Sequence, residues 1–279
     1  MQPGPQLPTL TSVLSFAFAM VLVMRCAGRR RPYYAVWAVG LAFFGLSSAA
    51  EAWGSASGWT VGLYRWWYLS GAICVAAYLG AGSLYLNSSR LVHWLAVAFV
   101  ASGCLPALAS GYLMEAIMGL AAAVLLAATR VRDTKSFASA ALSLLVLGTI
   151  LAGVRVLTAE VNTALLPQPH EIASGQAFPE GVRLLTPMFN IPGALLLLTG
   201  AGVSAVRWRE APARVASNAL IALGAFVPSL ASSLMRFGDS EQFYLGQLVG
   251  VLCLLGGFVV SDLSSAQPRL RPSVSSGPS

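Results

Sequence analysis

Long apolar stretches alternate with short polar breaks over almost the whole chain. A helix needs ~20 mostly apolar residues to cross a bilayer, and nine stretches of about that length can be recognised. The pattern therefore predicts an all-α, polytopic membrane bundle of about nine transmembrane helices, forming a single domain over residues 1–262. The predicted spans are 7–25, 33–53, 61–86, 91–109, 112–129, 137–158, 185–206, 215–235 and 243–262.

The basic residues predict which way the helices point. Of the 17 Lys and Arg residues, all but Arg65, Arg155, Arg183 and Arg236 fall in every second break or in the tail. Cytoplasmic loops of membrane proteins carry such an excess of Lys and Arg. We therefore expect the N-terminus outside and the C-terminus inside, with 263–279 as a cytoplasmic tail. The tail is rich in Ser and Pro, which predicts disorder.

Composition agrees with a membrane location and leaves no room for a separate soluble domain. The chain is 57% hydrophobic and 10% charged, whereas soluble domains carry about 25% charged residues. The net charge of +7 lies at helix ends, so we expect contact with the lipid bilayer and no nucleic-acid partner. Sixteen of the 17 basic residues are Arg, a bias typical of a GC-rich bacterial genome, and we expect the protein in the inner (plasma) membrane of a bacterium.

Catalytic and cofactor motifs are missing from the sequence. The single lysine, Lys135, lies in a predicted cytoplasmic loop, so no span carries a Schiff-base lysine. There are two histidines, no CxxC, and no HExxH, GxSxG or Walker motif. We therefore expect no metal and no cofactor, and on balance the sequence argues against an enzyme.

Several charged residues fall near the predicted outer ends of different helices. A charge inside hydrocarbon costs roughly 2.5–3.5 kcal/mol on insertion scales, so such groups usually face the bundle interior and find a partner. They could line one polar pocket that opens outward, or they could form separate interfacial ion pairs and reach to water. The five residues are Glu51, Arg65, Glu115, Arg155 and Arg236.

The predicted seventh span begins with two prolines that flank an asparagine. Pro187 and Pro192 each remove a backbone donor, which predicts a bend or break near the outer end. Asn190 lies between them and could bond the freed carbonyls or a ligand. Broken helices often line binding sites, but prolines are also common as plain kinks.

Two hairpins resemble each other in sequence. Residues 39–54 align with 223–238, and 68–80 align with 244–256, with matching Gly, Leu, Ser and Tyr positions. A duplication would give parallel repeats. The alternative is chance, because membrane helices draw on few residue types.

The connection 159–184 is the exception among the short loops. It holds three prolines and three acidic residues on the predicted outer side. A loop of this length is either a lid or binding element, or simply flexible.

Three functions fit these patterns. The first is a binding or passage module that takes a small polar or anionic solute, or a lipid headgroup, from the extracytoplasmic side, using the five charges and Asn190. The second is a non-catalytic sensor or assembly subunit that docks a membrane-protein partner through glycine-rich faces such as Gly246 and Gly250. The third is an intramembrane lipid-modifying enzyme with Glu51 or Glu115 as the base.

Overall fold

The computed structural model describes residues 5–87, 89–133, 135–169, 171–207, 211–234 and 240–266. Within these residues the chain is helical, with no strand. The long helices are α1 (Gln6–Arg29), α2 (Pro32–Ser57), α5 (Arg90–Gly103), α7 (Leu113–Arg132), α8 (Phe137–Thr158), α10 (Leu185–Arg207), α11 (Pro212–Leu234) and α12 (Ser240–Ala266). The shorter ones are α3 (Val61–Trp67), η1 (Tyr68–Cys74), α4 (Val75–Leu86), α6 (Leu105–Ala109), η2 (Thr163–Leu165), η3 (Gly175–Ala177) and α9 (Glu180–Arg183).

Eight helical stretches in the described chain are long and apolar enough to cross a membrane. Each of them coincides with a predicted span to within a few residues, so the all-helical fold is confirmed, and these helices are compatible with a multi-pass membrane protein. The remaining predicted span, 215–235, coincides with α11, whose apolar part runs over Val215–Pro228. The count of nine and the orientation in the membrane stay predictions.

Local signals fix where the helices begin. Pro32 occupies the first turn of α2, where its fixed φ suits a helix and its missing N–H is not needed. Thr60 Oγ1 accepts a hydrogen bond from Leu63 N (3.2 Å), and Ser89 Oγ accepts one from Val92 N (3.3 Å). These side chains satisfy backbone donors that the first turn of a helix leaves open.

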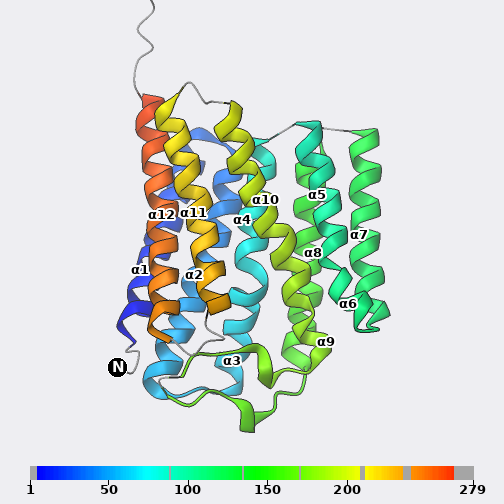
Figure 1. The fold of residues 1–279 in the computed structure, drawn as a ribbon, viewed down its shortest axis with the longest axis vertical. Helices are drawn as coiled ribbons and strands as arrows, with labels where there is room; N and C mark the ends of the chain where they lie inside the picture. Colours follow the sequence, from blue (N-terminus) through cyan, green and yellow to red (C-terminus); the bar gives the residue numbers. More distant parts are fainter. Residues whose placement is uncertain are drawn as a thin grey trace, which may run out of the picture.

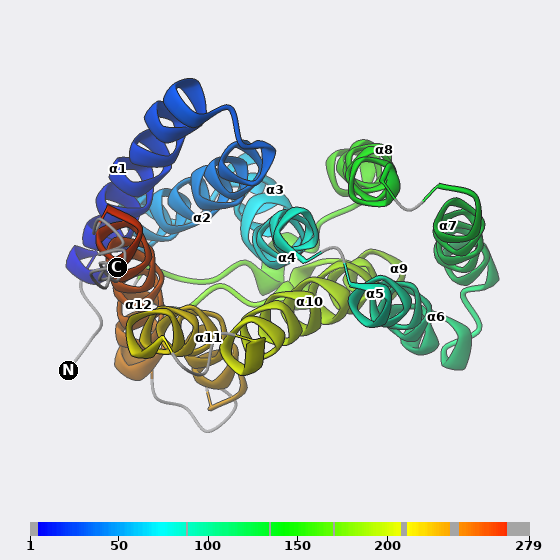
Figure 2. The same cartoon turned by 90° about the horizontal axis from the view of Figure 1, so that it is seen from above.

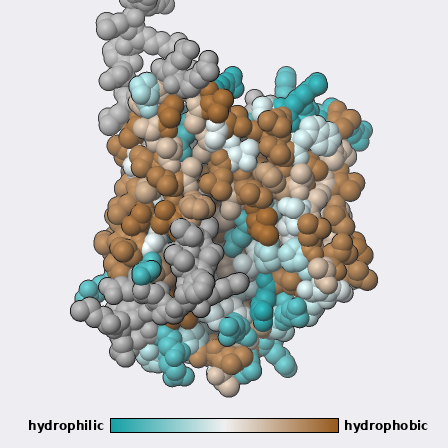
Figure 3. Space-filling model, viewed as in Figure 1, coloured by the Kyte–Doolittle hydropathy of each residue, from teal (hydrophilic) through white to brown (hydrophobic). Residues whose placement is uncertain are grey.

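The helices stand side by side in a bundle with two distinct ends (Figure 1). The segment 159–184 covers one end, which we call the loop end. The opposite end carries Arg29, Arg90 and Arg130, and we call it the basic end. The visible surface is largely apolar between the polar residues at the two ends (Figure 3).

Two central helices, α4 and α10, divide the bundle (Figure 2). They cross in direct backbone contact, because a Cβ atom added at Gly80 would collide with the Gly193 carbonyl oxygen, and one added at Gly193 would collide with that of Ala76. On one side lie α1, α2, α11 and α12, and on the other α5, α7 and α8. The crossing therefore joins the two sides of the molecule.

The third membrane-length stretch changes its winding midway. It begins as α3, widens into a π-helix over Tyr68–Cys74, and continues as α4. Ser70 Oγ donates to the Trp66 carbonyl oxygen at 2.7 Å, beside this wider turn. No sequence pattern indicates the π-helix, and such turns are frequent at functional sites.

The seventh predicted span is interrupted before the two prolines that predicted a bend or break. A turn at Leu184 separates α9 from α10, and α10 then continues unbroken through Pro192. Pro187 sits in the first turn of α10, where a helix tolerates proline.

The segment 159–184 is packed onto α3 rather than extended from the bundle. The Tyr64 hydroxyl donates to the Ser174 carbonyl oxygen and accepts from Ala177 N at 3.3 Å. The Phe178 ring stacks on Tyr64, with centroids 5.1 Å apart, and lies 4.7 Å from the Tyr68 ring. These contacts make the segment an ordered cap over the loop end.

The last helix runs a little further than predicted. It continues to Ala266, so the first four residues of the predicted tail 263–279 are helical, and the remainder lies outside the described residues. Gly250 packs within the molecule, since an added Cβ would collide with Pro228 Cγ. The hairpin duplication stays a prediction.

Candidate functional site

Of the six residues predicted to bind a ligand, the structure joins Glu115 and Arg155. Arg155 Nη2 donates to Glu115 Oε1, linking the first turn of α7 to the last turn of α8. The Glu115 side chain is 10% exposed and that of Arg155 is 52% exposed. The pair therefore has one shielded member and one that remains accessible.

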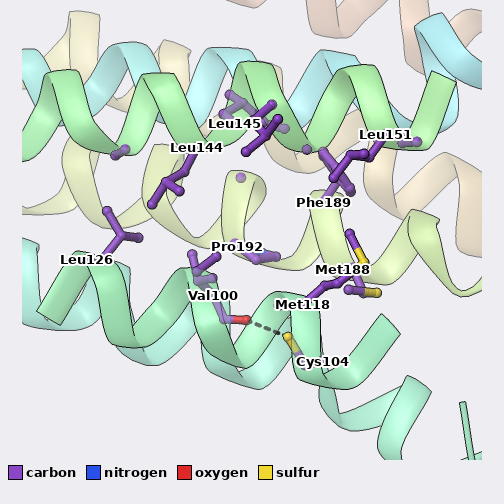
Figure 4. Close-up of a pocket in the computed structure, with 18 of the residues that line it drawn as sticks. Val100, Cys104, Met118, Leu126, Leu144, Leu145, Leu151, Met188, Phe189 and Pro192 are labelled. Atoms are coloured by element: carbon purple, nitrogen blue, oxygen red, sulfur yellow. Dashed lines mark hydrogen bonds between the residues drawn. The ribbon is translucent and has the colours of Figure 1, made fainter. Parts of the chain in front are cut away.

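Behind this ion pair lies a cavity of about 420 Å³. Residues from α4, α5, α7, α8 and α10 line it, and among these lining residues Glu115 and Arg155 are the two that carry a charge. Its wall is otherwise aliphatic, sulfur-containing or aromatic, as the close-up shows (Figure 4). The side chains labelled there are Val100, Cys104, Met118, Leu126, Leu144, Leu145, Leu151, Met188, Phe189 and Pro192.

The cavity is long and lies along the helices. Its lining on α8 runs from Ala141 to Arg155, about 20 Å at a helical rise of ~1.5 Å per residue. A bilayer has a hydrocarbon core of about 30 Å, so the cavity is longer than one leaflet is thick. Met118 and Leu147 of the lining are 44% and 54% exposed, so this part of the wall is loosely packed.

The cavity ends before the basic end of the bundle. Leu84, Leu126 and Leu196 belong both to its lining and to a buried cluster that includes Phe137. The His93 ring stacks on Phe137 with centroids 4.2 Å apart. The cavity therefore has a charged end near the cap and an apolar, closed end toward the basic end of the bundle.

Glu51 occupies a different place, on the other side of α4. It is 2% exposed, and its Oε1 accepts hydrogen bonds from Trp67 Nε1 (2.9 Å) and Gln247 Nε2 (3.3 Å). Ser48 Oγ donates to Gln247 Oε1 at 3.4 Å. This cluster ties α2 to α3 and α12.

The other predicted residues lie in further environments. Arg65 Nη2 donates to the Ala159 carbonyl oxygen (2.7 Å), which fastens the cap to α3. Asn190 Nδ2 donates to the Ala72 carbonyl oxygen (3.0 Å), within the π-helix. Asn190 thus bonds a backbone carbonyl, though one of a neighbouring helix rather than one freed by the prolines around it. Arg236 lies outside the described residues.

Sequence reasoning missed most of what surrounds these groups. In the sequence Trp67 resembles an interfacial anchor and Gln247 is one polar residue inside a span, yet both bind Glu51. The sequence places Trp67 and Gln247 at about the same membrane depth as Glu51, and this shared depth could have identified them as its partners. The cavity had no such signal, because no pattern along the chain distinguishes the wall of a hollow from a surface that faces lipid.

In the described part of the chain no three His, Cys, Asp or Glu residues group closely enough to hold a metal ion. Comparison with known proteins adds no assignment, because no family model, curated protein or solved structure matches the chain.

Proposed function

We propose that this protein binds a membrane amphiphile with one long hydrocarbon chain and an acidic headgroup, taken up from the extracytoplasmic side. In this proposal nine helices cross the membrane, with the loop end outside and the basic end inside. The hydrocarbon chain occupies the cavity between α7, α8 and α10, and the headgroup lies beside Arg155.

The observation that carries the proposal is the combination of a long apolar cavity with one charged end. Ligand pockets typically enclose about 300–1,000 Å³ and pair a mostly apolar wall with a few placed polar groups. The cavity of about 420 Å³ has this composition. A small polar solute would leave most of this wall unmatched, whereas an amphiphile matches both parts.

The charged end favours an acidic headgroup. A guanidinium has five N–H donors in a planar fork that suits phosphate and carboxylate oxygens. Arg155 contacts Glu115 through one terminal nitrogen and is half exposed, so it can bind a second anionic group. Glu115 holds the guanidinium in place at the charged end of the cavity.

Affinity in such a site would come mainly from the contacts of the headgroup and from the fit of the hydrocarbon chain to the cavity. A hydrocarbon chain that moves from lipid into the cavity exchanges one apolar environment for another, so it gains little hydrophobic free energy. The cavity wall therefore selects the length and form of the chain, and Arg155 supplies the specific attraction.

The first experiment fills the cavity. Ala122 lines it, while Val124 on the same helix is 67% exposed and does not. We expect Ala122→Phe to lower the amount of co-purifying amphiphile, measured by mass spectrometry of the protein released from native membranes, at least fivefold. Val124→Phe is the matched control and should retain the wild-type amount. Equal occupancy in both variants, or no bound amphiphile in the wild type, would contradict the proposal.

A second experiment tests the charged end. Arg155→Gln should weaken binding of an anionic single-chain lipid, titrated into nanodiscs, by about tenfold, the size of one charge-assisted contact. Arg183→Gln removes the same charge from an exposed position of α9 and should leave binding unchanged. If both substitutions weaken binding equally, only general electrostatic attraction is involved and Arg155 has no specific role.

A further inference from the structure

The Glu51 cluster is independent of the cavity and carries a second inference. Glu51 lies in α2, and the residues that bond it come from α3 and α12. Its carboxyl group is almost completely buried. Ionisable residues inside a membrane bundle are costly and usually belong to ion or proton pathways.

The hydrogen bonds of Glu51 are unevenly distributed over its two oxygens. Oε1 accepts from Trp67 and Gln247, whereas Oε2 is buried and has no hydrogen-bond partner among the described residues. A buried polar atom without a partner costs about 1–3 kcal/mol, more when it is charged. Oε2 therefore marks a place that one further group can fill.

The groups that face Glu51 offer no fixed positive charge from the described chain. Trp67 on α3, and Tyr244 and Gln247 on α12, are neutral. The described part of α1 before Arg25 has no ionisable side chain. Arg65, on α3, is engaged with the cap. With no counter-charge among the described residues, the buried carboxylate would cost several kcal/mol, and a small cation at Oε2 would relieve it.

The geometry distinguishes a proton from a metal cation. A hard metal ion needs several oxygen ligands around it. Gln247 turns its N–H group, not its carbonyl oxygen, toward Glu51, and that oxygen accepts from Ser48. Trp67 likewise presents an N–H group. A proton needs only the single open oxygen, so we propose that Glu51 is a buried proton-binding site, which takes up one proton on Oε2.

The surroundings indicate from which end the proton exchanges. Ser55 lies one turn further toward the loop end, is buried, and has a hydroxyl without a partner among the described residues. A hydroxyl can both donate and accept, as a proton relay requires. Toward the basic end, α1 and α2 pack together in an apolar cluster that includes Phe18, Leu22 and Leu41. Glu51 therefore exchanges its proton with the loop end.

Infrared difference spectroscopy of the protein in nanodiscs tests this assignment. The wild type should show the carbonyl band of a buried carboxylic acid at acidic pH, shifted in deuterated water and lost as the pH rises. Glu51→Gln should remove this band. Glu115→Gln is the matched control and should keep it, because Glu115 is paired with Arg155. No band in the wild type, or a band that persists in Glu51→Gln, would overturn the proposal.

A second test uses only the wild-type protein, so its result does not depend on the folding of the Glu51→Gln variant. An apolar, membrane-permeant carbodiimide reacts with protonated carboxyl groups, and peptide mass spectrometry locates the adduct. We expect labelling at Glu51 and not at Glu115, decreasing as the pH rises. Labelling that is absent from Glu51 at every pH would reject the site. Protection by Na⁺ at constant pH would show a metal cation in place of the proton and would equally overturn the assignment.

Discussion

Two helices from opposite sides of the α4–α10 pair (Figure 2), α12 and α8, have similar hydropathy but differ in packing. The membrane-length stretch of α12 has a mean hydropathy of 2.1 with 56% of its residues buried, whereas that of α8 has 2.2 with only 17% buried. Hydrophobicity therefore does not decide how closely a helix packs within a bilayer, since lipid is as apolar as the neighbouring helix.

Small residues explain the close approach of α11 and α12. A Cβ added at Gly224 or Gly257 would lie 2.6–2.8 Å from atoms of the facing helix, so α11 and α12 approach closely. On the other side, which we call the open side (α5, α7 and α8), the Cβ of Gly148 in α8 would be 3.2 Å from its nearest neighbour, Phe189, although a Cβ at Gly119 in α7 would collide with Cys104 Sγ. The side of α1, α2, α11 and α12 is thus the close-packed side, and the looser fit of α8 on the open side leaves room for the cavity.

The largest expected effect is at the crossing that joins the two sides. Gly193→Leu would drive a side chain into the backbone of α4 and should destabilise the bundle by about 3 kcal/mol or more. Thermal unfolding and size-exclusion chromatography in detergent measure this loss. Gly202→Leu on the same helix meets open space and is the control. A Gly193→Leu protein as stable as the control would show that the crossing does not hold the sides together.

An intermediate effect compares the same substitution on both sides. Leu41, in α2 on the close-packed side, is 1% exposed, whereas Leu157, in α8 on the open side, is 47% exposed. We expect Leu41→Ala to cost about 2–4 kcal/mol, through lost burial and the space left behind, and Leu157→Ala to cost less than about 0.5 kcal/mol. Denaturant unfolding of both variants measures the difference. Similar losses would mean that the open side is packed more tightly in the membrane than the described contacts indicate.

The smallest effect concerns the connection between α7 and α8 on the open side, which is held by local bonds. Asp133 accepts hydrogen bonds from the Ser136 hydroxyl and from Lys135 N, and these hold the pKa of its carboxyl below the usual range. The pKa of Asp133 is therefore lower in the folded state than in the unfolded state. The stabilisation of this connection by the Asp133 carboxylate is present above the unfolded-state pKa, and it is lost as the pH falls through the folded-state pKa.

Hydrogen exchange at the start of α8 measures this local effect. In the wild type we expect protection at neutral pH that decreases at acidic pH, after correction for intrinsic exchange rates. Asp133→Ala removes the acceptor, so its protection should be low at every pH. A variant that retains the acid-dependent change would assign the pH response to another group.

Much of the fold could be predicted from the sequence, because helix bounds depend on local patterns. The long apolar stretches between polar breaks located each long helix, and Pro32, Thr60 and Ser89 are recognisable start signals. The π-helix at Tyr68–Cys74 could not be predicted, because an apolar run has the same composition whether it winds with a normal or a wider turn.

The candidate site was only partly predictable. Glu115 and Arg155 were expected at one depth, and they pair. The prediction of a single pocket also included Glu51 and Arg65, which the structure places with α12 and with the cap. Depth follows from position along each helix, but the direction in which a side chain points around the bundle depends on how all the helices pack.

The cap has a consequence for how any occupant reaches the cavity. An added Cβ at Gly181 would lie 2.9 Å from the Tyr112 ring and 3.7 Å from Arg155 Nη2, so the cap passes directly over the charged end. The cap thus narrows the approach from the water to the half-exposed Arg155, and we expect the proposed amphiphile to enter from the lipid around the bundle instead. An occupant would arrive by two-dimensional diffusion, so saturation would depend on its mole fraction among the lipids rather than on its bulk concentration.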